Sequence, residues 1–177
     1  MILDLDETLI HATESPLATR CDFVVDRFYV HLRPGVRHFL AWCDQHFDVG
    51  IWTTANDAYA HEMVECILPA GMDLVFLWSE QECELVDVDE QHVALVKDLD
   101  RLDSLGTPLQ ETLVVDDTPE KLAYHLDNLI PMPAFLGDRS DRHLIALQHY
   151  LEFMRSEPDV YAHDLADWLS HPSLLDG

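Results

Sequence analysis

Residues 1–11 read MILDLDETLIH, and this stretch decides the fold that we expect. It opens with an apolar run over residues 1–3, which is typical of a strand buried in a parallel sheet. Asp4 and Asp6 follow, one residue apart, so both carboxylates would stand on one side of the strand where it ends. Open α/β sheets bind ligands at that edge, near the point where the strand order reverses. The stretch therefore predicts an α/β fold with a site at its first strand.

The two neighbouring carboxylates of this stretch require compensation. Two ionised carboxylates about 4 Å apart repel each other by roughly 4 kcal/mol at an effective dielectric of about 20. A hard divalent cation with oxygen ligands, Mg²⁺ by preference, would offset this repulsion, and so would a shared proton or a splayed geometry. The alternative is a turn with two solvated acids, because acid pairs are common in a chain with 34 acidic residues.

Length and charge limit the classes of protein. A chain of 177 residues, 48% of them hydrophobic, is enough for one domain with a packed core, and we expect residues 1–177 to form a single domain. The formal net charge is −24, from 34 acidic residues against 10 Lys and Arg. This charge disfavours a nucleic acid or an acidic membrane surface as partner. A phosphorylated substrate would need positive charge supplied locally at the site.

Cysteine and histidine usage indicates an intracellular protein without a zinc or redox motif. Four cysteines are irregularly spaced and form no CxxC pair, so buried reduced thiols are expected. Eleven histidines are scattered, and no HExxH motif is present. We find no signal peptide and no apolar run long enough to span a bilayer. The expected location is the cytoplasm, or the nucleus if the source is eukaryotic.

Strands and helices alternate along the rest of the chain. Residues 21–32, rich in Val, Phe and Tyr, predict a short hairpin, and the acidic segment 79–90 is expected to be irregular. Further strands are expected at 48–54, 74–78, 112–117 and 129–136, and helices at 34–47, 58–68, 99–105, 140–154 and about 160–170. Thr118-Pro119-Glu120 predicts one more helix start. This alternation predicts a Rossmann-like, doubly wound parallel sheet with helices on both faces.

Polar side chains gather at the ends of three of these strands. Asp4 and Asp6 follow the first strand, Thr53 ends the second, and Asp116 and Asp117 end the fourth. These ends lie along one edge of a parallel sheet, where Lys97 could reach them from a nearby loop. Acids with a metal ion and a lysine can bind a phosphoryl group, and a carboxylate can act as its nucleophile. A second carboxylate can then serve as general acid and base.

Five motifs together resemble a known family. They are DLDETLIH at 4–11, RPGV at 33–36, IWTTANDAYA at 51–60, VKDL at 96–99 and VVDDTP at 114–119. Their order and spacing resemble the haloacid dehalogenase (HAD) superfamily. Within it they are most similar to the RNA polymerase II C-terminal-domain (CTD) phosphatases, the TFIIF-associating and small CTD phosphatase family, also called NLI-interacting-factor-like. The resemblance covers about residues 1–155, and a last helix at about 160–170 would pack on that domain.

The resemblance implies an acid-based mechanism with Mg²⁺ as cofactor. Asp4 would be the nucleophile and a metal ligand. Asp6 would be the general acid and base and would bind Mg²⁺ through its backbone carbonyl. Asp117 would complete the metal shell, and Asp116 would bind it through water or orient Lys97.

The same resemblance implies a phosphate site. Thr53, with Thr54 beside it, would hydrogen-bond the phosphoryl oxygens, and Lys97 would neutralise them together with the nucleophile. Thr8 would support the loop through its hydroxyl, which would bond local backbone, and would belong to the phosphate-binding set.

The resemblance also implies an open site. Family members of this type lack a large cap domain, and here only the small hairpin at 21–32 follows the first motif, as a flap. An open site favours a phosphoprotein or phosphopeptide, on Ser, Thr or Tyr, over a small metabolite. Where the small CTD phosphatases carry an arginine beside the substrate groove, this chain has Trp78-Ser79-Glu80. The nucleophile is only the fourth residue, so the native chain could begin upstream.

Several other functions were weighed against a phosphatase. Receiver domains use similar residues, but in them the acid pair comes first, whereas here DxDxT comes first and the acid pair last. A catalytically weak or inactive phosphoprotein-binding relative would usually lose one of the carboxylates, and this chain keeps them. A phosphatase acting on nucleic-acid ends conflicts with the net charge of −24. A small-molecule phosphatase remains an alternative.

Overall fold

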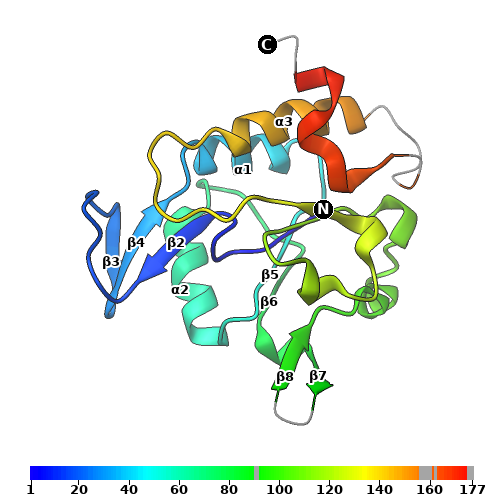
Figure 1. Cartoon of the computed structure of the whole chain (residues 1–177), viewed down its shortest axis with the longest axis horizontal. Helices are drawn as coiled ribbons and strands as arrows, with labels where there is room; N and C mark the ends of the chain where they lie inside the picture. Colours follow the sequence, from blue (N-terminus) through cyan, green and yellow to red (C-terminus); the bar gives the residue numbers. More distant parts are fainter. Residues whose placement is uncertain (90–91, 156–160, 162, 175–177) are drawn as a thin grey trace.

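The computed structural model describes residues 1–89, 92–155, 161 and 163–174. Within these residues a five-stranded, all-parallel sheet forms the centre of the molecule, in the order β10-β9-β1-β5-β6 (Figure 1). Its strands are β1 (Ile2–Leu3), β5 (Gly50–Trp52), β6 (Phe76–Trp78), β9 (Val114–Asp116) and β10 (Leu129–Pro131). The predicted Rossmann-like α/β sheet is therefore confirmed. Strand order reverses between β1 and β9, which is where such sheets place their ligands.

The two faces of the sheet are covered by different kinds of helix. Leu3 and Val115 belong to one buried cluster with α1 (Val36–Asp44), α2 (Asp57–Ile67) and α3 (His143–Met154), of which α1 and α3 lie side by side (Figure 1). Ile2 and Val114 point to the opposite face, as alternation along a strand requires. That second cluster is completed by the 3₁₀ helices η2 (Leu99–Leu105) and η4 (Pro119–Leu122). Helical segments thus cover both faces.

A small antiparallel sheet stands beside the main one. It consists of β2 (Ile10–Thr13), β4 (Phe28–Leu32) and β3 (Phe23–Val25), in that order. This confirms the hairpin predicted at 21–32 and adds β2, which continues the chain directly from the first motif. Asp26 forms the β3–β4 turn with a positive φ of 51°. No large cap domain accompanies this flap in the described part of the chain.

The segment predicted to be irregular, 79–90, is mostly ordered, so that prediction was wrong. Ser79 caps the short 3₁₀ helix η1 (Glu80–Glu82), and a hairpin of β7 (Glu84–Asp89) with β8 (His92–Val96) follows. This hairpin projects from the body of the molecule (Figure 1). Leu85 and Val93 remain 71% and 59% exposed, so its apolar residues do not pack in the core. The high density of acids concealed their strand alternation.

The C-terminal part departs from the prediction in its boundaries. Strand β10 ends at Pro131, earlier than expected, and does lie at the sheet edge. Helix α3 begins at His143, three residues after the predicted cap Ser140, whose hydroxyl bonds Asp138. In place of the helix expected at about 160–170, the described part has the 3₁₀ helix η7 (Leu165–Ser170); residues 156–160 and 162 lie outside the description. Buried Trp168 holds η7 on β10 by donating its indole hydrogen to the Pro131 carbonyl at 2.8 Å.

Two simple expectations can be checked directly. All four cysteines lie in the described residues and are free thiols. Among the described helices, none has the length and hydropathy to cross a membrane.

Candidate active site

Two buried carboxylates face each other at the point where strand order reverses. Asp4 directly follows β1, and Asp116 is the last residue of the neighbouring strand β9. Their exposed fractions are 1% and 0%, so water alone cannot compensate their charges. Burial raises the pKa of Asp116, and the negative charge of Asp4 adds to this effect against the opposing pull of two lysines. The sheet topology therefore assembles the acidic pair that the sequence motifs predicted.

Lys97 lies between these carboxylates, as the motifs predicted. Its Nζ donates to Oδ1 of Asp4 at 2.7 Å and to Oδ2 of Asp116 at 2.5 Å. The lysine itself is fully buried. Lys97 directly follows β8, which belongs to the β7–β8 hairpin that the sequence did not predict. The hairpin thereby brings the side chain to the ends of β1 and β9. One buried cation thus bridges both acids.

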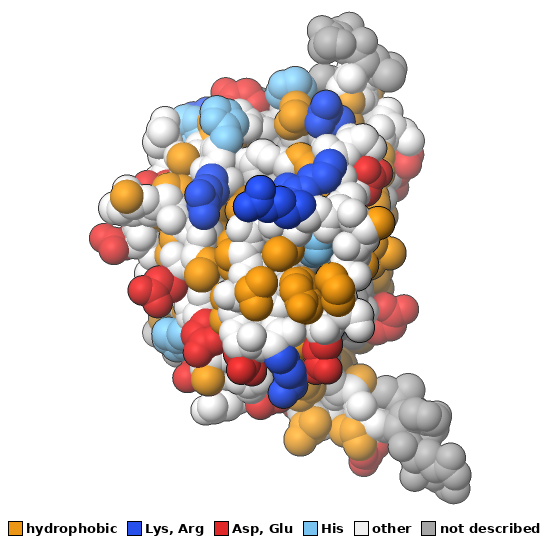
Figure 2. All heavy atoms as spheres, turned by 90° about the vertical axis from the view of Figure 1, so that its left-hand side faces the viewer, with side chains coloured by type: hydrophobic (Ala, Val, Ile, Leu, Met, Phe, Trp, Pro, Cys, Tyr) orange, Lys and Arg blue, Asp and Glu red, His pale blue; other side chains and the backbone are white. Residues whose placement is uncertain are grey.

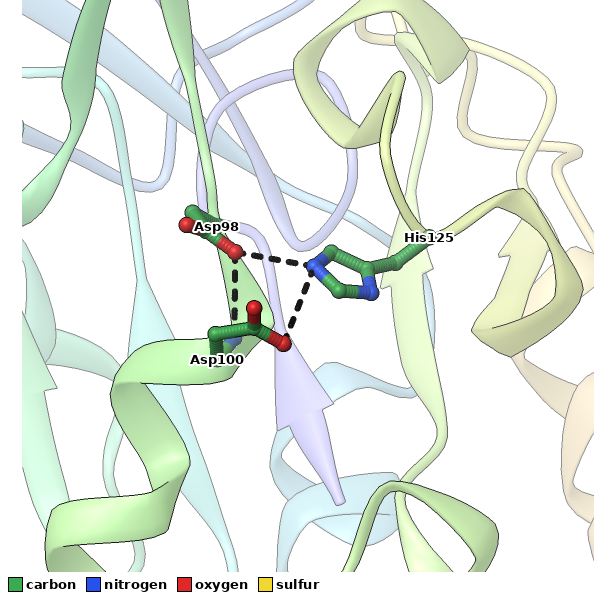
Figure 3. A group of neighbouring side chains, drawn as sticks. All are labelled: Asp98, Asp100 and His125. Carbon is green, nitrogen blue, oxygen red and sulfur yellow. Dashed lines mark hydrogen bonds and ion pairs between the residues drawn. The ribbon is translucent and has the colours of Figure 1, made fainter.

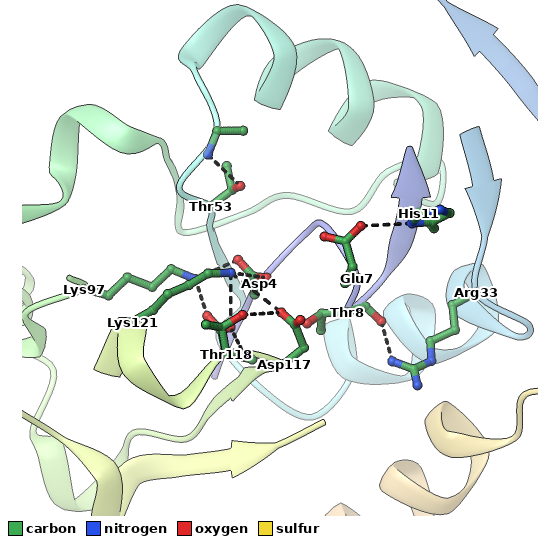
Figure 4. Close-up of polar contacts among 12 residues, drawn as sticks. Asp4, Glu7, Thr8, His11, Arg33, Thr53, Lys97, Asp117, Thr118 and Lys121 are labelled. Carbon is green, nitrogen blue, oxygen red and sulfur yellow. Dashed lines mark hydrogen bonds and ion pairs between the residues drawn. The ribbon is translucent and has the colours of Figure 1, made fainter. Parts of the chain in front are cut away.

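Lys121 is a second cation of the site, and the sequence analysis missed it. Its Nζ lies 3.2 Å from Oδ2 of Asp4, 3.3 Å from Oδ1 of Asp116 and 3.7 Å from Oδ1 of Asp117. Figure 4 shows both lysines reaching Asp4 from the same side. Burial lowers the pKa of Lys121, but the three carboxylates outweigh that effect and the net change is upward. The sequence did contain a signal for it. The chain has only two lysines, so each is a candidate for the positive charge that the acids of the site need.

Three carboxylates form a cluster that fits a divalent cation. Oxygen atoms of Asp4, Asp116 and Asp117 all lie within 4.8 Å of one another. Mg²⁺ prefers such hard oxygen ligands, so the donor set fits the expected cofactor. The backbone N–H of Thr118 donates to Oδ1 of Asp116 at 2.9 Å, which orients that carboxylate. The side chain of Asp6 is not part of this cluster.

Asp6 has a different environment from Asp4. Its Oδ1 accepts a short hydrogen bond from the hydroxyl of Tyr59, which α2 supplies. Burial raises the pKa of Asp6 to about 6, while the bond from Tyr59 acts in the opposite direction. A carboxyl group with such a pKa can hold or release a proton near neutral pH. Tyr59 was not predicted, because only the fold brings α2 against the first motif.

The three predicted threonines differ in burial and in hydrogen bonding. Thr53 is buried after β5, and its Oγ1 accepts from the backbone N–H of Ala55 at 3.1 Å, while Thr54 next to it is half-buried. Thr8 is fully buried, and its hydroxyl has no hydrogen-bond partner among the described residues. The predicted bond from that hydroxyl to local backbone is therefore wrong. Instead, the guanidinium of buried Arg33 donates to the Thr8 carbonyl at 3.0 Å and holds the loop.

Glu7, between Asp6 and Thr8 in the first motif, has a left-handed backbone conformation. Its φ is 57°, which is uncommon for a residue other than glycine. Its carbonyl accepts from the N–H of Phe135 at 2.6 Å, and its carboxylate contacts His11 Nδ1 at 2.9 Å. This contact gives His11 a structural role in the loop. Strained backbone of this kind is often found at functional loops.

A second polar group ties together the segments that carry the two lysines. His125 Nε2 contacts Oδ1 of Asp98 at 2.9 Å and lies 4.0 Å from Asp100 (Figure 3). The hydrogen bond from His125 lowers the pKa of Asp98. Asp98 directly follows Lys97, and the backbone N–H of Lys97 also donates to the Lys121 carbonyl at 2.7 Å. This group therefore fixes the spacing of the two lysines.

An open groove of about 530 Å³ leads away from Asp6. Its walls come from the β3–β4 turn, from α2 and from the first motif, and its acidic lining residues are Asp6, Glu7, Asp26 and Glu62. Arg27 is the one basic lining residue, and it pairs with Glu14 at 2.7 Å. Figure 2 shows the flap side of the molecule, where acidic side chains surround an isolated basic one below a hydrophobic area. The groove is therefore net acidic.

An arginine lies beside Trp78 in the fold, although the sequence has none next to it. No arginine follows β6 in the sequence at Trp78-Ser79-Glu80. In the fold, however, the guanidinium of Arg101 lies 5.8 Å from the centre of the Trp78 ring. Arg101 comes from η2, and the sequence analysis did not predict this contact.

Comparison with known proteins identifies the family. The model of the family described as "NLI interacting factor-like phosphatase" matches residues 1–161. The CTD small phosphatase-like protein 3 of Caenorhabditis elegans is 33% identical over 159 residues, covering 86% of this chain and 53% of the relative. The human CTD small phosphatase-like protein is 29% identical over 170 residues, covering 92% and 58%. The chain belongs to the NLI interacting factor-like phosphatase family, as the five motifs predicted.

Solved structures agree on the fold. The fission yeast RNA polymerase II CTD phosphatase Fcp1 aligns with a TM-score of 0.56 at 22% identity, covering 91% of this chain and 52% of that one. A protein from Listeria monocytogenes aligns with a TM-score of 0.52 at 18% identity, covering 79% and 83%. At these identities the likeness concerns the fold alone. The chain spans a little over half the length of the curated relatives reported above.

Proposed function

We propose that this protein is a Mg²⁺-dependent phosphatase that hydrolyses phosphomonoesters of phosphoproteins through an aspartyl-phosphate intermediate. The observation that carries the proposal is Asp4 itself, a buried carboxylate held at 2.7 Å by Lys97 at the switch point of the sheet. Membership of a phosphatase family supports the reaction class. The three-carboxylate cluster supports the choice of a divalent metal.

The residues divide the reaction into two steps. A carboxylate oxygen of Asp4 attacks phosphorus, the bond from phosphorus to the ester oxygen breaks, and protonated Asp6 gives its proton to that leaving oxygen. Asp6 then takes a proton from the water that hydrolyses the aspartyl phosphate, which releases phosphate and restores Asp4. Lys97 and the hydroxyl of Thr53 would stabilise the phosphoryl oxygens. Mg²⁺ held by Asp4, Asp116 and Asp117 would supply further positive charge for the transferring group.

The shape of the site supports a phosphoprotein substrate. The groove beside Asp6 is open and is lined by a flap of one small sheet, with no large cap over it in the described residues. A peptide segment can lie along such a groove, whereas a small metabolite would usually be enclosed. Two alternatives to a phosphoprotein phosphatase are a small-molecule phosphatase and a catalytically weak or inactive phosphoprotein-binding module.

Phosphate release tests the proposal directly. The substrates would be p-nitrophenyl phosphate and a panel of phosphoserine, phosphothreonine and phosphotyrosine peptides, each with Mg²⁺ and with EDTA. We expect Mg²⁺-dependent release that is fastest on one class of phosphopeptide. Binding of phosphopeptides without any release would favour the inactive module, and faster turnover of small phosphate esters than of every peptide would favour the small-molecule alternative.

Removal of the Tyr59 hydroxyl should change the pH profile. Its hydrogen bond lowers the pKa of Asp6, which is about 6, so Tyr59→Phe should raise that pKa. Because Asp6 must be protonated to act as an acid, the falling limb of kcat/KM should move toward higher pH, by roughly half a pH unit. The measurement is kcat/KM between pH 4.5 and 8 with phenyl phosphate, whose leaving group needs a proton.

The better leaving group of p-nitrophenyl phosphate provides the control for this variant. It depends less on an acid, so the falling limb of its profile should be shallower in both proteins. A limb that keeps its position with phenyl phosphate in Tyr59→Phe would show that Tyr59 does not set the pKa of Asp6.

The acidic groove predicts a charge preference around the phosphorylated residue. Phosphopeptides with flanking Arg or Lys should have kcat/KM about tenfold above matched peptides with flanking Glu, and salt should reduce the difference. Glu62→Gln, in the groove wall, should lower the ratio. Glu65→Gln makes the same change on α2 outside the groove lining and is the matched control. Equal rates for both peptides would contradict the preference.

A further inference from the structure

The two lysines of this chain have different positions in the site. Lys97 contacts Asp4 and Asp116 and is fully buried. Lys121 contacts the same two acids from their other oxygens, also lies near Asp117, and its side chain is 18% exposed. Only Lys121 therefore touches all three carboxylates of the cluster that fits a divalent cation. Lys97 and Lys121 are the only two lysines in the sequence, so both lysines lie at this cluster.

We propose that the Lys121 ammonium group occupies the cation position among Asp4, Asp116 and Asp117, and that metal binding displaces it. The inference rests on the metal site of the proposed function and concerns how that site is regulated. The Lys121 Nζ lies 3.2, 3.3 and 3.7 Å from oxygens of the three carboxylates, so a divalent cation bound by the same three groups would approach this ammonium closely and repel it. Lys121 would act as an internal counter-ion that keeps the acids compensated before Mg²⁺ arrives.

Charge and position favour this exchange. Three carboxylates face two ammonium groups, so one negative charge is left uncompensated. A divalent cation that replaces Lys121 brings the cluster close to neutrality, whereas one that is simply added leaves an excess of positive charge. The side chain of Lys97 is fully buried, so its ammonium group cannot turn toward solvent. The side chain of Lys121 is partly exposed and comes from the short helix η4, so its ammonium group can turn toward solvent.

Calorimetric titration with MgCl₂ tests the exchange without any turnover. Lys121→Met removes the charge and keeps most of the side-chain length, so it should bind Mg²⁺ at least about tenfold more tightly than the wild type. Lys121→Arg keeps the charge and should bind Mg²⁺ no more tightly than the wild type. Arg155→Met removes one positive charge from the surface pair with Glu152 and is the matched control for net charge. Unchanged or weaker binding in Lys121→Met would overturn the proposal.

A second measurement uses the wild type, so it does not depend on the folding of a variant. Lysine acetylation by a water-soluble reagent is followed at each lysine by peptide mapping, with Mg²⁺ and with EDTA. Displacement should make Lys121 several-fold more reactive when Mg²⁺ is present, while buried Lys97 stays protected as an internal reference. Equal or lower reactivity of Lys121 with Mg²⁺ would overturn the proposal.

The two experiments separate this inference from the proposed function. Mg²⁺ binding that tightens in Lys121→Met, in a protein that hydrolyses none of the substrates, would support the exchange and contradict the phosphatase. Turnover with no Mg²⁺ binding in either protein would contradict the exchange.

Discussion

Asp4→Asn is expected to lower kcat for phosphate release by a factor of about 10⁴ or more while leaving the protein folded. An amide has nearly the shape of a carboxylate, but it cannot attack phosphorus to form an acyl phosphate. The fold should tolerate the change because Lys97 and Lys121 both keep Asp116 as a partner. The measurement is kcat on the best phosphopeptide beside the melting temperature of each protein.

Asp6→Asn is the companion variant for this experiment. It keeps the nucleophile but lacks both the acid for the leaving oxygen and the base that takes a proton from water. With p-nitrophenyl phosphate, whose leaving group depends less on an acid, the phosphorylated protein should therefore accumulate. Acid quenching followed by peptide mapping should recover phosphate on the peptide that contains Asp4.

Turnover of Asp4→Asn above about 1% of the wild type would show that another group attacks phosphorus.

Local patterns in the sequence were sufficient for the fold and for the site acids. An apolar run followed by DxD places Asp4 at the end of a buried strand, and the VVDD run does the same for Asp116. Such signals are local, because a parallel strand buried on both faces is apolar throughout and polar only where it ends. Parallel pairing then brings these ends together without further information.

Two side chains of the site were not recognised from the sequence, although one of them belongs to a motif. Tyr59 is part of the motif at 51–60, but its approach to Asp6 is determined by how α2 packs. Lys121 extends from the 3₁₀ helix η4, two residues after the motif at 114–119. The hairpin that delivers Lys97 was missed for another reason. It stands away from the core, so its strands lack the buried face from which strands are usually predicted.

The electrostatics of the site also depend on this tertiary arrangement. In a chain with a net charge of −24, the acids at the sheet edge are compensated by the two lysines, one enclosed and one partly exposed. The hydrogen bond from His125 to Asp98 and the backbone bond from Lys97 to Lys121 hold these cations in place. The two lysines leave one negative charge of the cluster uncompensated, so the proposed phosphorylated substrate would need the further positive charge of Mg²⁺ at the site.

Lys97→Met should be the most destabilising single change at this site. It leaves Asp4 and Asp116 buried with Lys121 as their remaining cation, and breaking a buried ion pair from one side costs roughly 3–5 kcal/mol of unfolding free energy. For a domain of this size that corresponds to a melting temperature lower by roughly 6–20 °C. Phosphate release should also fall, by about 10³-fold, because the phosphoryl oxygens lose a buried cation.

The two consequences of Lys97→Met can be separated by the metal. Melting temperatures would be measured in EDTA and in Mg²⁺, and the loss of stability should be smaller with Mg²⁺, since the metal replaces part of the missing charge. Kinetics at a temperature where the variant is fully folded then report catalysis alone. Arg155→Met, which breaks an exposed pair, should cost less than about 1 kcal/mol and serves as the control. A Lys97→Met protein as stable in EDTA as Arg155→Met would contradict the prediction and would mean that Lys121 alone compensates the buried acids.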